Sequence, residues 1–217
     1  GCMFGRYSLD KKGLVLANQG ETLEDYLEQL AKDGVEHPSF TPDADNIIPI
    51  LDDEWFEDDI VGRFQEFLKV SFGTENYEKN LAFVDECLGG KGIRKYFTKD
   101  FYADHIKRYK KRPIYWMFSS PTGSFNVLIY MHRYTPDTLN KVLNDYLKEY
   151  REKLKTELER LEHIKNTGLS REQTLAIKAQ DSINKVLLEL NEYEREVLYP
   201  IASQRINIDL DDGCLLY

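Results

Sequence analysis

Five positively charged side chains fall within six consecutive residues near the middle of the chain. The stretch "IKRYKKRPIYWMFSS", which starts at Ile106, contains Lys107, Arg108, Lys110, Lys111 and Arg112. Lysine and arginine neutralise phosphate groups, and the interleaved aromatic rings of Tyr109, Tyr115 and Trp116 can stack on nucleobases. This pattern predicts a phosphate-binding surface, with two further basic residues, His132 and Arg133, as weaker candidates.

An alternative explanation of the same residues is a solvated helix face, or one that pairs with the acidic residues of the chain. The segment 91–112 holds nine Lys or Arg against Asp100 and Asp104, a local net charge of +7 in a chain of net charge −9. The negative net charge of the chain argues against nonspecific binding along nucleic acid. The clustering of positive charges in one segment still allows a single basic surface that binds it. The residues between Ile114 and Phe118 are expected to belong to the hydrophobic core rather than to form a surface on which nucleobases stack.

The acidic run 43–59 contains eight Asp or Glu and no basic residue. Carboxylates bind magnesium or calcium, but the run lacks the glycine-centred spacing of a calcium loop. Asp52, Asp53 and Glu54 precede an expected helix, whose N-terminus favours negative charge, so we interpret them as capping residues. No metal ligand is assigned.

No catalytic motif is legible in the sequence. The sequence contains no recognisable Ser–His–Asp or Cys–His arrangement, and it lacks the GxxxxGK[ST] loop that binds phosphate groups. We therefore assign no catalytic residue and no cofactor-binding residue. The three cysteines show no CxxC spacing and fit a reducing cytosol. No apolar run of about 18 residues exists, so no membrane partner is expected.

The elements that would position these residues begin with a helix at "TLEDYLEQLAKDG", with Thr22 as N-cap and Asp25 completing a capping box. Residues 14–17 are a short strand candidate, and Pro49 confines "NIIPIL" to a sheet edge or a strand end. Three helical stretches should follow: one from Asp52 to Phe72, one in "NYEKNLAFVDECLG" and one in "IRKYFTKDFYADHIKRY", which carries the cations.

Two aromatic and aliphatic runs flank Pro121-Thr122-Gly123 and predict a β-hairpin. Thr135-Pro136-Asp137 should then start a helix. Two seams with apolar residues spaced by threes and fours follow, one from Leu139 to Leu161 and one from Ala176 to Val197. A break at 166–168 predicts an antiparallel, coiled-coil-like helical hairpin that ends at Pro200.

The expected fold class is therefore α+β and mostly α-helical. We expect a mixed helical and β-hairpin module with a basic surface at 1–134, an antiparallel helical hairpin at 135–205 and a C-terminal tail at 206–217. A chain that opens on Gly, with Met only third, is expected to be a piece of a longer protein.

Several blocks of sequence, in this order, carry a family resemblance. They are "GCMFGRYSLD", "NIIPILDDEWFEDDIVGRFQEFLKVSFG", "YFTKDFYADHIKRYKKRPIYWMFSS", "GSFNVLIYMHRYTPDTL" and "INIDLDDG". Together they resemble the C-terminal part of PglX-type adenine-specific DNA methyltransferases, the modification enzymes of BREX phage-defence systems. More distantly, "RPIYW" and "HRYTPDTL" are similar to part of fused restriction-modification enzymes.

The resemblance implies a parent enzyme that transfers a methyl group from S-adenosylmethionine to N6 of adenine. That chemistry needs an Asn/Asp/Ser-Pro-Pro-aromatic loop around an extruded adenine, and this chain has no Pro-Pro pair. The catalytic core and its cofactor are therefore expected upstream. The implied partners are double-stranded DNA, the upstream methyltransferase domain and other BREX subunits, in a prokaryotic cytoplasm.

Three functions stay open from the sequence. The first is a DNA-engaging segment, in which the basic residues position phosphates and the hairpin loop at Thr122–Ser124 holds or reads the duplex. The second is a protein-interaction scaffold that docks through the helical hairpin. The third is a magnesium-dependent nuclease that uses the acidic run.

Overall fold

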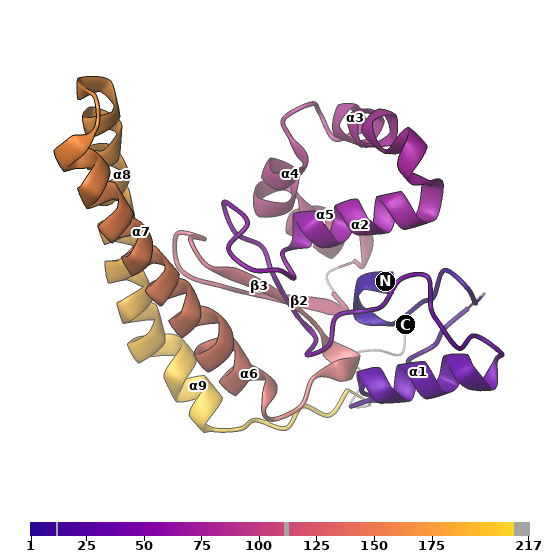
Figure 1. Cartoon of the computed structure of the whole chain (residues 1–217). Coiled ribbons are helices and arrows are strands. Elements are labelled where there is room, and N and C mark those ends of the chain that lie inside the picture. Colours follow the sequence, from indigo (N-terminus) through magenta and orange to yellow (C-terminus); the bar gives the residue numbers. More distant parts are fainter. Residues whose placement is uncertain (12, 111–112, 211–217) are drawn as a thin grey trace. The chain divides into compact units, whose positions relative to one another are not determined.

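The computed structural model describes residues 1–11, 13–110 and 113–210. It is mostly helical with one small antiparallel sheet, which confirms the expected α+β class (Figure 1). The chain divides into two compact units. Unit 1 holds Gly1–Phe118, Asn126–Thr138 and Asn207–Tyr217, and unit 2 holds Ser119–Phe125 and Leu139–Ile206. The boundaries predicted at 134/135 and 205/206 stay predictions.

Unit 1 begins with a 3-10 turn, Cys2–Phe4, and helix α1, Leu23–Lys32. The predicted capping box is confirmed, because the Thr22 side chain accepts from the backbone amide of Asp25 and the Asp25 carboxylate accepts from that of Thr22. The strand expected at 14–17 is reduced to one isolated bridge between Tyr7 and Leu14.

The sheet of unit 1 has the strand order β1-β3-β2, with β1 at Ile47–Pro49, β2 at Tyr115–Ser119 and β3 at Asn126–Tyr130. Strand β1 pairs antiparallel with β3 and brings Ile48 opposite Leu128. Pro49 therefore lies on an edge strand, as its missing amide hydrogen predicts. Strands β2 and β3 form the predicted hairpin. Every residue of β3 is buried, which matches its central position.

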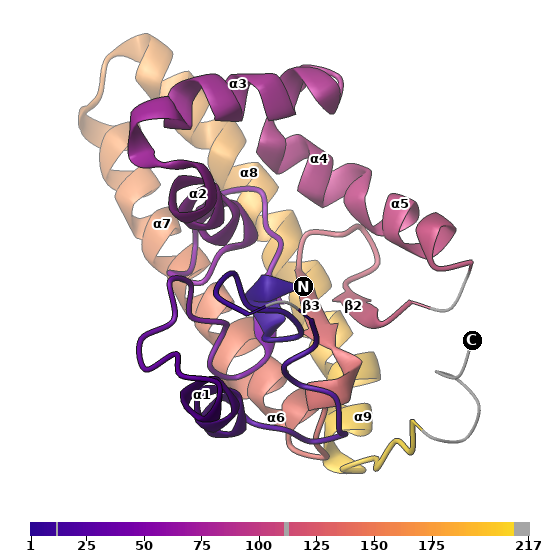
Figure 2. The same ribbon diagram turned by 90° about the vertical axis from the view of Figure 1, so that its right-hand side faces the viewer.

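Four helices complete unit 1: α2 at Ile60–Phe72, α3 at Tyr77–Cys87, α4 at Ile93–Lys99 and α5 at Phe101–Arg108. Helix α2 begins later than expected, because its N-cap is Asp59, whose carboxylate accepts from the amides of Val61 and Gly62. The capping interpretation of Asp52, Asp53 and Glu54 was therefore wrong. The cation-rich stretch forms two helices that meet at Asp100, and Figure 2 shows α4 and α5 following one another.

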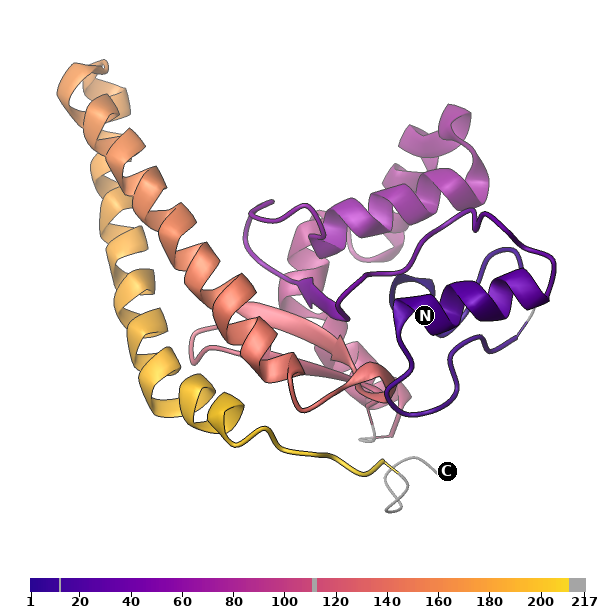
Figure 3. The same cartoon turned by 60° about the horizontal axis from the view of Figure 1, so that its bottom comes forward.

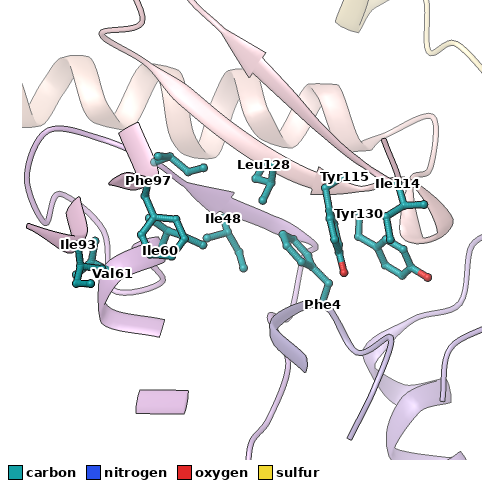
Figure 4. Close-up of a cluster of buried hydrophobic side chains, with 11 residues drawn as sticks. Phe4, Ile48, Ile60, Val61, Ile93, Phe97, Ile114, Tyr115, Leu128 and Tyr130 are labelled. Atoms are coloured by element: carbon teal, nitrogen blue, oxygen red, sulfur yellow. The ribbon is translucent and has the colours of Figure 1, made fainter. Parts of the chain in front are cut away.

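The main core of unit 1 joins the sheet to these helices and to the N-terminal turn. Phe4 stacks on Tyr115 with ring centroids 5.1 Å apart, and Tyr130 lies 5.4 Å from Tyr115 (Figure 4). From α2 and α4, Ile60 and Phe97 pack into the same cluster. The sheet therefore supports α4 and α5, the helices that carry the cations.

Unit 2 is built on the predicted helical hairpin. Its first arm runs through α6 at Thr138–Lys141, a π-helical segment at Val142–Leu147 and α7 at Lys148–Thr167. Its second arm runs through α8 at Ser170–Tyr193, a π-helical segment at Glu194–Leu198 and α9 at Tyr199–Ser203. Helices α7 and α8 pack side by side, as Figures 1 and 3 show. The first arm begins three residues after Thr135, and Pro200 lies inside the second arm instead of ending it.

The predicted apolar seam fails at the π-helical segment of the second arm, Glu194–Leu198. A π turn holds one residue more than an α turn, so it shifts the buried face by one position. Val197, a predicted seam residue, is 40% exposed, whereas Leu198 is 1% exposed. The first arm keeps its seam, with Leu143, Leu147 and Tyr150 buried. Within the described ranges, none of the helices combines the length and apolar composition that a membrane span requires.

Candidate nucleic-acid interface

The last turn of α5 carries the described part of the predicted basic cluster. Lys107 and Arg108 are exposed, Tyr109 is the C-cap, and Lys110 follows with a φ of 51° in the left-handed region. A residue in this conformation just beyond a helix ends it and turns the chain. Helix α5 therefore presents three cations at one of its ends.

These cations are not neutralised within the part of the chain that the structure describes. No carboxylate among residues 1–11, 13–110 and 113–210 forms an ion pair with Lys107, Arg108 or Lys110. Cations at a helix C-terminus also stabilise the helix through its dipole, which is a structural role for the same residues. Both roles are compatible with exposed side chains.

The other predicted residues lie in different settings. Lys111 and Arg112 fall outside the described residues. His132 is half-buried, and its ring stacks on Tyr130 with centroids 5.3 Å apart and planes 23° apart. Its ring is therefore engaged in packing within unit 1.

Arg133 is buried, with 5% of its surface exposed. Its guanidinium donates from Nη1 to the carbonyl oxygen of Asp43 at 2.7 Å and from Nη2 to that of Ala44 at 2.9 Å. A DNA phosphate cannot reach a side chain in this position without opening the core. The burial of Arg133 and its two backbone partners therefore speak against a phosphate contact and indicate a structural role.

The acidic run supplies a carboxylate cluster beside Arg133. Single carboxylate oxygens of Asp43, Asp45 and Asp58 lie within 4.8 Å of one another. Burial raises the pKa of Asp43 to about 7, and the charges of Asp45 and Asp58 and a hydrogen bond with Asp45 act in the same direction. The Asp43 carboxylate also accepts from the amide of Ile47 at 3.1 Å, so it orders the entry to β1.

A second acid of the run pairs with a cation of the basic segment. Arg94 donates to both carboxylate oxygens of Asp59, at 2.9 and 2.8 Å, and also to the carbonyl of Leu51 at 3.0 Å. Asp59 is 1% exposed. Arg94, which belongs to the basic segment 91–112 but not to the predicted cluster, therefore pairs with the acidic run.

Sequence reasoning missed two further exposed cations, Lys95 and Lys99 on α4. Their spacing of four residues places them on one face of the helix, one turn apart. That spacing is visible in "IRKYFTK", but only the denser cluster of cations further along the chain was assigned to the surface. The exposed cations of α4, of α5 and of the residue after its C-cap are Lys95, Lys99, Lys107, Arg108 and Lys110.

The aromatic residues around the cluster differ in accessibility. Tyr115 is 8% exposed and belongs to the core, whereas Tyr109 and Trp116 are each 38% exposed. The indole of Trp116 donates to the carbonyl of Pro113 at 3.2 Å. His105 is buried against Tyr109, Tyr115 and Phe101. Its pKa is lowered mainly by burial and also by the charges of the N-terminus and Arg108.

The loop of the β-hairpin is engaged by a carboxylate of α8, within unit 2. Glu189 accepts from the amide of Thr122 at 2.9 Å, from the hydroxyl of Ser124 at 2.9 Å and from the hydroxyl of Thr122. Burial alone would raise the pKa of Glu189, but these hydrogen bonds and one from Ser120 lower it below its ordinary value. The loop predicted to hold DNA thus has its donors occupied in this structure.

Comparison with known proteins gives two close matches. The chain is 39% identical over 226 residues to the adenine-specific methyltransferase BrxX of Escherichia coli O9:H4 (strain HS). It is 37% identical over 227 residues to the adenine-specific methyltransferase PglX of Lacticaseibacillus casei (strain Zhang). No protein-family profile matches the chain.

The alignments cover 98% and 100% of this chain but only 18% of the length of each relative. The chain thus spans about a fifth of the curated proteins that it matches. Both matches agree with the resemblance drawn from the ordered sequence blocks. The chain is therefore related by sequence to a segment of the PglX-type adenine-specific methyltransferases.

Proposed function

We propose that this chain is a non-catalytic, DNA-engaging segment of an adenine-specific DNA methyltransferase of the restriction-modification and phage-defence type. One observation carries the proposal: Lys107, Arg108 and Lys110 project from the end of α5, exposed and without an ion-pair partner in the described part of the chain. Two further exposed lysines, Lys95 and Lys99, lie on the preceding helix, α4.

The chemistry of this surface fits a duplex backbone. Lysine and arginine contacts to phosphate fix the position of a protein on DNA without reading its sequence. In the proposed function the segment holds the duplex, in a prokaryotic cytoplasm, while an upstream domain supplies S-adenosylmethionine binding and methyl transfer. Lys111 and Arg112 are proposed as part of the same surface from the sequence.

A charge-reversal variant tests this proposal. In fluorescence anisotropy with a labelled duplex, Lys107→Glu/Arg108→Glu/Lys110→Glu should bind at least tenfold more weakly than the unmodified chain. The matched control, Arg171→Glu/Lys178→Glu/Lys185→Glu, changes the net charge equally on exposed positions of α8. Equal loss in both variants would show a general charge effect and contradict the assignment of α5.

A second candidate function is docking of another protein subunit at the tip of the helical hairpin. The tip exposes Leu169 and Leu175, which are 74% and 58% exposed, beside a hollow of about 470 Å³ lined by Leu161 and Ile164. Exposed apolar surface of this kind is typical of protein-binding sites. The proposed partners are the methyltransferase core or another BREX subunit. Sedimentation velocity can test self-association separately, and a monomer at every concentration would exclude a second copy as the partner.

A further inference from the structure

A cavity of about 400 Å³ lies beside the basic end of α5 in unit 1. Three of its lining residues, Phe4, Phe97 and Leu128, belong to the main core, whose side chains are drawn in Figure 4. Its volume falls in the range of small-ligand sites, which are typically about 300–1,000 Å³. Gly1, Met3 and Tyr7 of the N-terminal segment also line the cavity.

The rim of the cavity is aromatic. Tyr109 is 38% exposed, and its ring centroid lies 4.7 Å from that of His105 at an interplanar angle of 45°. Tyr96 is half-buried and packs edge-on against Phe101 at 6.2 Å. All four side chains line the cavity. Planar nucleobases stack on aromatic side chains regardless of their sequence.

Two charged groups line the same cavity and could bind the polar edge of a base. The Asp104 carboxylate is an acceptor that takes one hydrogen bond from the Tyr96 hydroxyl at 3.3 Å. Arg108 adds donors from the last turn of α5. A carboxylate and a guanidinium together provide the acceptor and donor types that recognise base edges.

Residues that line the cavity are direct sequence neighbours of the exposed cations. Arg108 and Tyr109, which line the cavity, stand between Lys107 and Lys110, which face solvent. A nucleotide presents its base and its phosphate on opposite sides of one sugar, so both groups could be held within this short stretch. Charge complementarity therefore favours a nucleic-acid occupant over an apolar protein side chain.

We propose that this cavity binds one unpaired nucleobase of a DNA strand whose phosphates contact Lys107 and Lys110. This inference rests on the proposed function, because it requires DNA on the basic surface of α5. It adds a preference that the proposed function lacks: DNA with an extrahelical base should bind more tightly than a fully paired duplex.

Two duplexes of equal length test this preference with the full chain, one fully paired and one with a single bulged 2-aminopurine. The bulged duplex should bind at least about fivefold more tightly, since one base–aromatic stack contributes about 1 kcal/mol or more. The fluorescence of 2-aminopurine should fall on binding as the base stacks. Tyr109→Ala should remove both the preference for the bulged duplex and the fall in 2-aminopurine fluorescence.

Two control variants separate stacking from loss of structure. Tyr109→Phe retains the ring and should keep the preference, and Phe83→Ala removes an aromatic ring that is 66% exposed on α3 and does not line the cavity. Equal affinity of the unmodified chain for both duplexes, with salt-sensitive binding to each, would overturn the base site and leave the proposed function standing. A preference that survives in Tyr109→Ala would also overturn it. Failure to bind either duplex would overturn both proposals.

Discussion

Arg133 donates from Nη1 to the carbonyl oxygen of Asp43 at 2.7 Å, and its positive charge lies beside the cluster of Asp43, Asp45 and Asp58. The two residues are 90 positions apart in the chain, and the contact connects the entry of β1 with the 3-10 turn that follows β3. Arg133 therefore acts as an internal cation that connects two parts of unit 1, whereas the side chains of Lys107, Arg108 and Lys110 are exposed.

Replacement of this arginine should cost stability and not affinity for DNA. Arg133→Gln removes a buried cation and leaves two backbone carbonyls unsatisfied, so the free energy of unfolding should fall by about 2–4 kcal/mol. Urea denaturation measures the change, with the exposed Arg171→Gln as control. Under conditions where Arg133→Gln stays folded, a large loss of DNA affinity would contradict the internal role.

The pH dependence of stability should report on Asp43. Its pKa is raised from 3.8 to about 7 by burial and by Asp45 and Asp58, so the folded state holds the proton more tightly than the unfolded state. Stability is therefore lost as the pH rises from about 4 through 7, by at most about 1.4 kcal/mol per pH unit. Asp43→Asn should flatten this part of the curve. The exposed Asp181→Asn is the control, and an unchanged slope in Asp43→Asn would contradict the assignment.

The ion pair between Arg94 and Asp59 should be important for the stability of unit 1. Arg94→Leu leaves the N-cap carboxylate of α2 buried without its cation, and such a loss typically costs about 3–5 kcal/mol. Lys95→Leu, an exposed neighbour on α4, is the matched control in thermal denaturation. The double variant Asp59→Asn/Arg94→Leu should recover part of the loss, because no uncompensated charge remains. No recovery would show that packing, rather than charge, dominates.

The contact of Glu189 with the hairpin loop should stabilise unit 2 above acidic pH. Glu189→Gln weakens charge-assisted hydrogen bonds to Thr122 and Ser124, so we expect a loss of about 1–2 kcal/mol near pH 7. The lowered pKa of Glu189 means that its contribution is present above the ordinary value of 4.5 and is lost as the pH falls through the folded-state value. The two proteins should therefore converge at low pH. The control Glu192→Gln, on an exposed position of the same helix, should behave like the unmodified chain.

Much of the fold follows from local sequence signals. The capping box of Thr22 and Asp25, the edge position of Pro49 and the hairpin around Pro121-Thr122-Gly123 each depend on a few neighbouring residues, and each is present. The start of α2 was missed, because aromatic residues at 55 and 56 continue the helical spacing although Asp59 is the residue that caps the helix. The two π-helical segments were not predicted, because apolar spacings of three and four residues fit an uninterrupted α-helix equally well.

The candidate site was harder to predict than the fold, because contacts between residues far apart in the sequence decide which charged side chains are exposed. Lys107 and Arg108 are exposed, as charged side chains usually are, but Arg133 is buried because its guanidinium binds carbonyl groups 89 and 90 residues away. The partner of Arg94 likewise lies 35 residues earlier in the chain. Composition identifies which side chains carry charge, and only tertiary contacts decide which of them remain available to a ligand.

The salt dependence of duplex binding tests the central claim most directly, in the unmodified chain and in Lys107→Glu/Arg108→Glu/Lys110→Glu between 50 and 200 mM salt. Each phosphate contact contributes a slope of about −0.9 to the logarithm of affinity against the logarithm of salt concentration. We predict a steep slope for the unmodified chain, and a slope shallower by roughly 2–3 for the variant. Equal slopes and equal affinities in the two proteins would contradict the proposal that the end of α5 binds the DNA backbone.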